Sequence, residues 1–258
     1  MHRLAAPDFL LPDWPAPAHV RALSTSRGLA FQPEFGDSAG IYAALNLGTH
    51  VGDAPAAVLA NRQLLQQFCD LPRQPAWLNQ VHGVAVLDLD WWQGQLTDAD
   101  ASVTSLQGLA AVVMTADCLP VLFCDRQGRK VAAAHAGWRG LCDGVLEATL
   151  QHFPEPADVL AWLGPAIGPV HFEVGNEVRA AFMAKDPQAA TAFVPSHNAG
   201  KYLADIYLLA QQRLQAAGVS AIYGGDYCTV ADPQRFFSYR RDGQTGRQAS
   251  LIWLTAAI

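Results

Sequence analysis

Two histidines and one cysteine stand out by residue type and by setting. His82 lies in the segment Asn-Gln-Val-His-Gly, Cys118 in Thr-Ala-Asp-Cys-Leu-Pro, and His135 in Ala-Ala-His-Ala-Gly-Trp-Arg-Gly. Each side chain is placed at the edge of an apolar stretch beside glycine or proline, where loops on a rigid scaffold often carry functional groups. The three residues are too far apart along the chain for local spacing to join them, so only the fold could bring them together.

Two imidazoles and one thiolate form a donor set that suits zinc. A catalytic zinc site keeps three protein ligands and leaves one position open, whereas a structural site uses four. The competing interpretation is that these are packing residues, because cysteine is among the residue types most often fully buried. The placement of His82, Cys118 and His135 at strand ends favours the metal site and predicts catalysis there.

The same residues allow two other chemistries. Cys118 could be a nucleophile with His135 as its base, the pairing that cysteine hydrolases use. Such a dyad has no evident need of His82, whereas a metal does. A His₂Cys set also describes blue copper, but the eight histidines of the chain contain no H-x-H pair of the kind that multicopper oxidation of phenols needs. Copper therefore remains an alternative to zinc.

Several arginines are candidates for binding an anionic substrate group, because a guanidinium can bind phosphate through two parallel hydrogen bonds. Most arginines form weak exposed ion pairs instead, and we assign Arg241 to that class. Arg27 and Arg139 are the stronger candidates because each precedes a glycine. The full set of candidates comprises Arg27, Arg62, Arg139, Arg240, Arg241 and Arg247.

Short apolar segments bounded by Pro, Gly or Asp predict the strands that must position these side chains. We expect strands at 76–78, 85–89, 109–115, 121–124, 131–135, 159–163, 221–223 and 250–254. We expect one helix after Asp53 as N-cap, one with its apolar face from Leu141 to Phe153, one through Glu177 to Met183, and one from Asp205 to Gly218. Because strands outnumber helices and do not alternate strictly with them, the pattern predicts an α+β fold with mixed sheets.

Composition excludes several classes of protein. The chain has 258 residues, of which 51% are hydrophobic and 16% charged, so it can bury roughly 70% of its unfolded surface. The net charge of −6 and the lack of a basic run exclude general nucleic-acid binding. The most apolar stretch, 109–124, is broken by Asp117 and Pro120 and is not expected to span a membrane.

The sequence also predicts a compartment. Residues 1–8 contain too few apolar residues for a signal peptide. The five cysteines are odd in number and form no C-x-x-C pair, which is typical of a reduced protein. We therefore expect a cytoplasmic protein, and nothing in the sequence predicts its oligomeric state.

Taken together, the motifs resemble the YfiH-type family, whose members are also called laccase-domain or polyphenol-oxidase-like proteins. The similar blocks run in the family's order from about residue 24 to 247 and cover nearly the whole chain. They comprise Asn46-Leu47-Gly48, Val51-Gly52-Asp53, Asn61-Arg62, Gln80-Val81-His82-Gly83, Asp98-Ala99-Asp100-Ala101, Thr115-Ala116-Asp117-Cys118, His135-Ala136-Gly137-Trp138-Arg139-Gly140, Gly164-Pro165-Ala166-Ile167-Gly168-Pro169 and Phe236-Phe237-Ser238-Tyr239-Arg240-Arg241-Asp242-Gly243.

The resemblance implies a fold and a set of site residues. The fold would be a single catalytic domain over residues 1–258, a layered α/β sandwich of mixed sheets with outer helices. A cytotoxic deamidase that uses a Cys–His pair shares this architecture, which gives the thiol alternative a basis in the fold. The family's metal ligands fall on His82, Cys118 and His135. The candidate substrate- or anion-binding residues are Asn46, Arg62 and Arg139 within the similar blocks, and Arg27. Arg27 lies in the segment 25–28, which matches the family's Thr-Thr-Arg-x-Gly-Gly block only loosely because the second glycine is absent here.

The resemblance also implies an activity. Family members are described as zinc-dependent enzymes that phosphorolyse adenosine, inosine and methylthioadenosine and that deaminate adenosine. Copper-dependent polyphenol oxidation and editing of peptidoglycan precursors are attributed to some members. We therefore expect an enzyme that takes a purine nucleoside and phosphate. In deamination a zinc-activated water would attack purine C6, and in phosphorolysis an arginine-held phosphate would attack the anomeric carbon of ribose.

Three alternatives remain open at this point. The first is a hydrolase or amidase that uses Cys118 and His135 to edit peptidoglycan precursors. The second is a copper-dependent polyphenol oxidase. The third is a protein that holds a metal without catalysis, which three ligands and an open coordination position disfavour.

Overall fold

The computed structural model describes residues 9–28 and 36–256 of the chain. Residues 1–8, 29–35 and 257–258 lie outside the described part, and with them the N-terminal segment considered above for a signal peptide. Within the described part, no helix has both the length and the apolar character that crossing a membrane requires.

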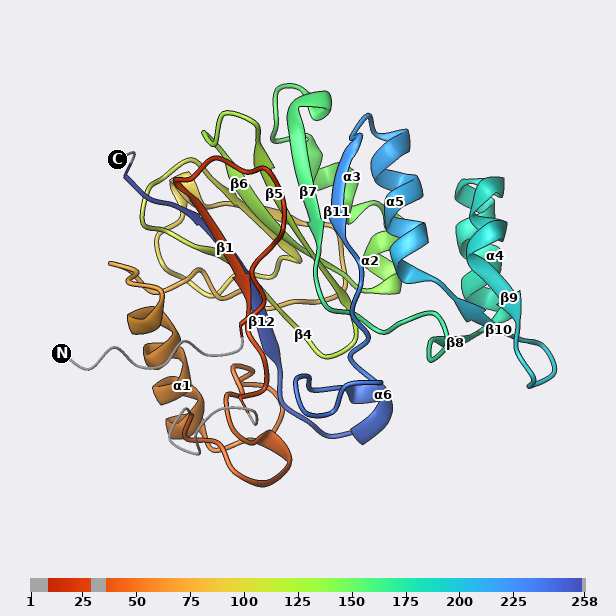
Figure 1. Cartoon of the computed structure of the whole chain (residues 1–258), viewed down its shortest axis with the longest axis horizontal. Helices are drawn as coiled ribbons and strands as arrows, with labels where there is room; N and C mark the ends of the chain where they lie inside the picture. Colours follow the sequence, from red (N-terminus) through yellow and green to blue (C-terminus); the bar gives the residue numbers. More distant parts are fainter. Residues whose placement is uncertain (1–8, 29–35, 257–258) are drawn as a thin grey trace.

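A six-stranded mixed sheet lies at the centre of the structure, with the strand order β11-β7-β5-β6-β3-β2 (Figure 1). β5 pairs antiparallel with both β6 and β7, whereas the outer pairs β2–β3 and β7–β11 are parallel. The six strands are β2 (Val86–Asp88), β3 (Ala101–Thr104), β5 (Leu119–Asp125), β6 (Val131–Ala136), β7 (Val159–Leu163) and β11 (Ala221–Gly224).

Two antiparallel three-stranded sheets accompany the central one. The first has the order β1-β12-β4, and the second the order β8-β10-β9. The first comprises β1 (Val20–Ser24), β4 (Ala111–Thr115) and β12 (Gln248–Leu254), and the second β8 (Glu173–Gly175), β9 (Phe193–Pro195) and β10 (Lys201–Ala204).

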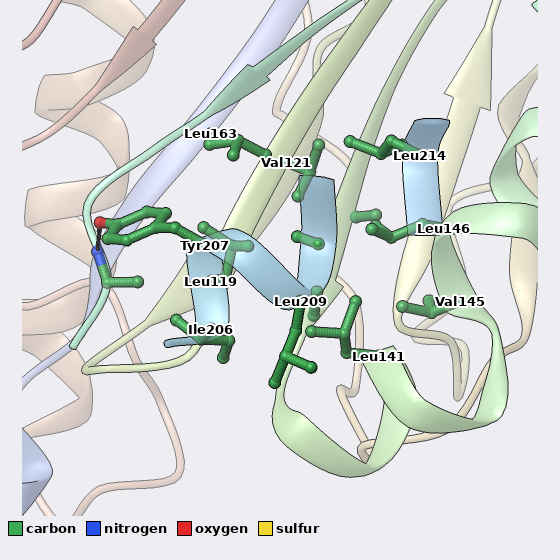
Figure 2. Close-up of a cluster of buried hydrophobic side chains, with 14 of the residues drawn as sticks. Leu119, Val121, Leu141, Val145, Leu146, Leu163, Ile206, Tyr207, Leu209 and Leu214 are labelled. Carbon is green, nitrogen blue, oxygen red and sulfur yellow. Dashed lines mark hydrogen bonds between the residues drawn. The ribbon is translucent and has the colours of Figure 1, made fainter. Parts of the chain in front are cut away.

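Helices cover the outer faces of this arrangement. α2, α3 and α5 pack on one face of the six-stranded sheet, where Leu119 and Val121 of β5 meet Leu141, Leu146 and Leu209 (Figure 2). The α-helices are α1 (Pro55–Phe68), α2 (Trp138–Asp143), α3 (Val145–Leu150), α4 (Asn176–Lys185), α5 (Ile206–Ala216) and α6 (Tyr239–Asp242). Short 3₁₀ helices lie at Gly40–Tyr42, Leu89–Trp91, Pro156–Asp158 and Pro187–Ala192.

The six-stranded sheet and the sheet β1-β12-β4 pack face to face, so that their inner strands are covered on both sides. On β5, Val121 and Phe123 belong to the core under the helices, whereas Leu122 and Cys124 belong to the core between the sheets. Strand β4 alternates in the same way, and its outer face packs on Leu65 of α1. Strands buried on both faces read as continuous apolar runs, which explains why 109–115 and 121–124 were recognisable from sequence.

The α+β class with mixed sheets is confirmed, and most predicted strands are present. Residues 76–78 are an exception, since they form only an isolated bridge between Ala76 and Ala111. β1, β3 and the sheet β8-β10-β9 were not predicted from the sequence, and their strands are only three to five residues long.

The predicted helix from 141 to 153 was wrong in its continuity, because Gly144 adopts a φ of 110° and divides it into α2 and α3. Asp53 was wrong as the N-cap of α1, since its carboxylate accepts hydrogen bonds from Ser38 and Asn46 and the backbone N–H of Ala54. Asp205 does cap α5 by accepting from the N–H of Leu208, and the last turn closes at Gly218 as expected.

Candidate functional site

His82, Cys118 and His135 come together in the structure. Each offers one ligand atom, and these three atoms lie within 4.8 Å of one another. Cys118 Sγ lies 3.9 Å from His82 Nε2, and the two imidazole rings meet edge to face with their centroids 4.8 Å apart. The fold therefore brings together three residues that are remote along the chain.

Strand pairing accounts for much of this arrangement. His135 lies on β6 opposite Pro120 of β5. Cys118 immediately precedes β5, so Cys118 and His135 lie at the same end of the β5–β6 pair. His82 reaches the same place from the loop before β2, where its backbone adopts a φ of 61°. A Cβ on Gly137 would lie 2.8 Å from His82 Cδ2 and 3.2 Å from Cys118 Sγ, so only glycine fits between the ligands.

Asp100 organises the two histidines. Its carboxylate accepts a hydrogen bond of 2.8 Å from Nδ1 of His135 and further bonds from the backbone N–H groups of Val81, His82 and Gly83 at 3.2, 2.9 and 2.6 Å. With Nδ1 of His135 donating to Asp100, Nε2 is left with a lone pair directed elsewhere. The sequence analysis assigned no role to Asp100, although it lies in one of the blocks that carried the resemblance.

Charges within this cluster shift its protonation states. Burial raises the pKa of the Cys118 thiol, but the charge of His135 and hydrogen bonds from both histidines outweigh it and lower that pKa. Burial lowers the pKa of His135, yet the Cys118 sulfur and the Asp100 carboxylate together raise it. Without a metal the group therefore favours a thiolate beside a positively charged imidazole, and a metal that binds Nε2 of His135 would displace the second proton of that ring. A thiolate is the form that binds metals and attacks electrophiles.

The donor set fits a zinc ion. Tetrahedral zinc with bonds of about 2.0–2.3 Å to nitrogen and sulfur needs donors roughly 3.3–3.6 Å apart, close to the 3.9 Å between Cys118 Sγ and His82 Nε2. The ligand atoms would be Nε2 of both histidines and Sγ of Cys118. Asp100 supplies the carboxylate–histidine contact that orients metal ligands in proteins.

The three residues line a cavity of about 400 Å³, a size within the range of small-molecule sites. Part of the wall is apolar and aromatic and belongs to the core under the helices or packs against it. This part consists of Trp138, Ile167, Phe172 and Ile206.

Another part of the wall is polar and mostly cationic. Gln80 is bonded through its side-chain amide to both backbone groups of Met114, which fixes the segment before His82 against β4. The polar residues that line the cavity besides the three candidate ligands include His50, Gln80, Arg139, Arg240 and Arg247. His50 and Gln80 were not selected from sequence, because neither lies in a setting that differs from an ordinary loop.

Asp117 lines the cavity beside Cys118, and both oxygens of its carboxylate already accept hydrogen bonds. Its backbone adopts a φ of 98°, and its carboxylate accepts bonds of 2.6 Å from both the Thr229 hydroxyl and the backbone N–H of Arg240. These bonds fasten the segment that carries Tyr239 and Arg240 to the turn that carries Cys118.

The structure places the predicted substrate residues in different locations. Arg139 lines the cavity, whereas Arg27 and Arg62 do not. Arg27 donates to the carbonyls of Ala43 and Pro233 and lies over the ring of Phe237. Arg62 donates to the carbonyl of Leu47 and lies 4.0 Å from the centroid of the Trp77 ring.

Asn46 is fully buried and holds neighbouring backbone segments together. Its side-chain oxygen accepts from the N–H groups of Gly48 and Arg247, and its amide donates to Asp53. Among the C-terminal arginines, Arg241 forms an ion pair with Asp242 as predicted, but it is only partly exposed and also donates to the carbonyls of Thr229 and Phe236, so it is more than a weak surface ion pair.

The chain is similar to known proteins over nearly its whole length. A family model described as multi-copper polyphenol oxidoreductase laccase matches residues 28–255. Purine nucleoside phosphorylase PA4543 of Pseudomonas aeruginosa is 55% identical over 247 residues, covering 95% of this chain and 98% of the relative. Purine nucleoside phosphorylase YfiH of Escherichia coli is 54% identical over 248 residues, with the same coverage of both chains.

Solved structures are similar over the same length. The crystal structure of Neisseria meningitidis protein NMB0706 matches with a TM-score of 0.90 and 53% identity, covering 96% of this chain and all of that chain (100%). The structure of YlmD from Geobacillus stearothermophilus matches with a TM-score of 0.85 and 30% identity, covering 98% of both chains.

Proposed function

The chain belongs to the YfiH family, and we propose that it is a zinc-dependent purine nucleoside phosphorylase of the cytoplasm. The substrates would be adenosine, inosine and methylthioadenosine together with phosphate, and adenosine deamination would be a second reaction at the same site. The naming of relatives more than 50% identical as purine nucleoside phosphorylases supports the substrate class.

The observation that carries the proposal is the composition of one cavity. The candidate ligands His82, Cys118 and His135 line the same cavity as an aromatic wall and several cationic side chains. A purine ring is held by apolar and aromatic surfaces, and a phosphate by cationic hydrogen-bond donors. A cavity that offers both beside a set of zinc-binding side chains suits a nucleoside and phosphate together.

In phosphorolysis a phosphate oxygen bonds to the anomeric carbon of ribose, the bond from that carbon to the purine nitrogen breaks, and its electron pair leaves with the purine, which gains a proton. A zinc ion held by His82, Cys118 and His135 would supply Lewis-acid stabilisation of developing charge and, for deamination, an activated water. Trp138 and Phe172 would hold the purine ring, and a cationic side chain of the cavity wall would orient phosphate for attack.

The protein's own groups prepare this site before substrate binds. Asp100 holds His135 in one tautomer and fixes the loop of His82 through three backbone bonds. Preorganised groups of this kind lower the cost of reorganisation during reaction. Zinc is proposed over copper because two imidazoles and one thiolate are a donor set of catalytic zinc sites, and the sulfur of Met114, the methionine of the cavity wall, already accepts a hydrogen bond from Arg62 at 3.6 Å.

A second candidate function is a thiol hydrolase or amidase. Asp100, His135 and Cys118 have the order of groups found in cysteine hydrolases, with the carboxylate bonded to the imidazole at 2.8 Å. A zinc enzyme needs the Cys118 sulfur as a metal ligand, whereas a thiol enzyme needs it free to attack the substrate. Removal of the metal should therefore abolish the first activity and spare the second.

The test measures the metal content of the purified protein and its activity on adenosine, inosine and methylthioadenosine with phosphate. We expect close to one zinc per chain, production of ribose 1-phosphate or its methylthio analogue, and loss of turnover after chelation. Readdition of zinc should restore turnover to a greater extent than readdition of copper.

Hydrolysis of a peptidoglycan-precursor amide that survives chelation but is abolished by thiol alkylation would replace the phosphorylase proposal with the thiol enzyme. Absence of phosphorolysis from zinc-loaded protein would also contradict the proposal. Oxidation of a phenol that depends on copper would favour the oxidase instead.

A further inference from the structure

Arg247 differs from the other arginines at the cavity in its burial, since Arg139 and Arg240 are exposed and, like Arg247, form no ion pair with a described carboxylate. It is half-buried, and none of the described carboxylates forms an ion pair with it. Its Nη1 donates to the carbonyls of Thr245 and Gly246 at 3.1 and 3.0 Å, while Nε and Nη2 have no hydrogen-bond partner among the described residues. Burial of a guanidinium whose N–H donors are unpaired costs free energy, and a bound anion would offset that cost.

The position of Arg247 is fixed by its surroundings. Its backbone N–H donates to Asn46 at 2.9 Å, and its carbonyl accepts from the N–H of Leu47 at 3.1 Å. A Cβ on Gly48 would lie 2.8 Å from Cγ of Arg247, so the side chain passes closely over that glycine. The guanidinium is thus presented to the cavity by a rigid frame, and little side-chain entropy is lost when it binds a ligand.

His50 belongs to the same frame. The segment that carries it is held by bonds from the Tyr42 hydroxyl and the Gln244 amide to the carbonyl of Val51 at 2.7 and 3.2 Å. His50 is exposed at the cavity, and partial desolvation of its ring, followed by the positive charge of Arg247, lowers its pKa. A neutral imidazole retains one N–H donor, and among the described residues the ring has no hydrogen-bond partner.

The cavity holds little negative charge of its own near these groups. Among its described lining residues Asp117 is the one carboxylate, and both of its oxygens are engaged by Thr229 and Arg240. Arg247 and His50 therefore present free donors in a cavity whose one described carboxylate is already engaged and whose thiolate, at Cys118, is a candidate metal ligand.

We propose that Arg247 and His50 form the subsite that binds the phosphate co-substrate. This assignment rests on the proposed phosphorylase function and specifies which of the cavity's cationic groups serves each substrate. Phosphate is a tetrahedral dianion near neutral pH, and a guanidinium fork with a neighbouring N–H donor matches adjacent oxygens of such a group.

The remaining cavity arginines suit the nucleoside. Arg139 is exposed and lies 4.5 Å from the centroid of the Trp138 ring. Arg240 lies 5.7 Å from the centroid of Phe172, and its Nη1 already donates to two backbone carbonyls. Both are associated with the aromatic wall proposed to hold the purine, so they border the base and not the phosphate.

The experiment measures steady-state phosphorolysis of inosine by zinc-loaded protein while phosphate and inosine are varied separately. For Arg247→Gln we expect the KM for phosphate to rise about 10- to 100-fold, because a charge-assisted pair of hydrogen bonds is lost. The KM for inosine should change less than about 3-fold. Arg247→Lys should give an intermediate effect, and His50→Gln should raise the phosphate KM by about 3- to 10-fold.

Arg139→Gln and Arg240→Gln are the matched comparisons, and both should leave the phosphate KM near that of the unmodified protein. Zinc content and thermal unfolding of every variant show whether a change arises from loss of metal or of fold. If Arg247→Gln does not fold, Arg247→Lys and His50→Gln carry the test.

A phosphate KM that is unchanged in these variants, or that rises in Arg139→Gln or Arg240→Gln instead, would overturn the assignment. Titration calorimetry with inorganic phosphate separates this failure from failure of the proposed function. Phosphate binding that is lost in Arg247→Gln would uphold the subsite even if the protein does not phosphorolyse inosine. Absence of phosphate binding to the unmodified protein would overturn it.

Discussion

The two ends of strand β5 carry the same pair of residue types in opposite order and use them differently. Asp117 and Cys118 precede the strand, and Cys124 and Asp125 end it. At the first end Cys118 faces two imidazoles and a cavity. At the second end Cys124 is fully buried between the two packed sheets, and Asp125 accepts backbone bonds from Arg129 and Lys130 in the turn to β6.

The contrast shows that surroundings, and not residue type, set the chemistry of a cysteine. At Cys118 the nearby imidazoles outweigh burial and lower the thiol pKa. At Cys124 burial is reinforced by the charge of Asp125 and raises the thiol pKa to about 12. One sulfur is therefore prepared as a ligand or nucleophile, and the other is an inert part of the core.

Thiol labelling should give the largest difference between the two ends. In metal-free protein at pH 7, iodoacetamide should modify Cys118 at least about 1000-fold faster than Cys124, because only Cys118 is substantially a thiolate. The lowered pKa means that Cys118 labelling reaches its plateau at a lower pH than a free cysteine does, while Cys124 stays protonated through pH 9. Peptide mass spectrometry over a pH series measures both rates.

Zinc is the control for this labelling experiment. Saturation with zinc should protect Cys118 and leave the rate at Cys124 unchanged. Equal labelling of the two cysteines, or no protection by zinc, would contradict the difference between the two ends of β5.

Substitution of Cys118 and of Cys124 by alanine tests the same difference between the two ends of β5. Cys118→Ala should lose tightly bound zinc and lower phosphorolysis by more than about 100-fold, because it removes a metal ligand. Cys124→Ala should retain zinc and turnover and lose about 1–2 kcal/mol of unfolding free energy through a small cavity. Elemental analysis, activity and denaturant unfolding test the pair, and a zinc-replete, active Cys118→Ala protein would remove the basis of the metal site.

Asp100→Asn should have a smaller effect, because the ligands themselves remain. The substitution removes the negative charge that orients His135 and one acceptor for the His82 loop, and should weaken zinc binding about 10- to 100-fold. Competition with a chromophoric chelator measures the affinity. Asp90→Asn is a matched control, since Asp90 accepts bonds from Thr104 and Ser105 away from the cavity; equal affinity in both variants would deny Asp100 its positioning role.

The three candidate ligands could be selected from sequence because each lies next to a recognisable local feature, an apolar strand followed or preceded by glycine or proline. The layered fold could be predicted for the strands covered on both faces, since burial leaves a continuous apolar run. The sheet β8-β10-β9 could not, because its strands are short and partly exposed.

The residues that hold the candidate ligands and the cavity in place were harder to predict from the sequence. Asp100 acts through the pairing of β3 with β6, a long-range contact that no local pattern encodes. Arg27 and Asn46 lie beside glycines or in similar blocks, yet their partners are backbone groups away from the cavity. Arg247 is distinguished from Arg139 and Arg240, which also line the cavity without an ion-pair partner among the described residues, by its burial, and burial depends on the folded chain.

The position of β12 has a consequence for how the protein is made. This strand is last along the described chain, yet it lies in the middle of its sheet, between β1 and β4, and Arg247 immediately precedes it. A ribosome releases His82, Cys118 and His135 before β12 emerges, so the three candidate ligands are synthesised while the middle strand of the sheet β1-β12-β4 is still missing. Completion of that sheet, and of the cavity wall that carries Arg247, can therefore occur only after almost the whole chain has been synthesised.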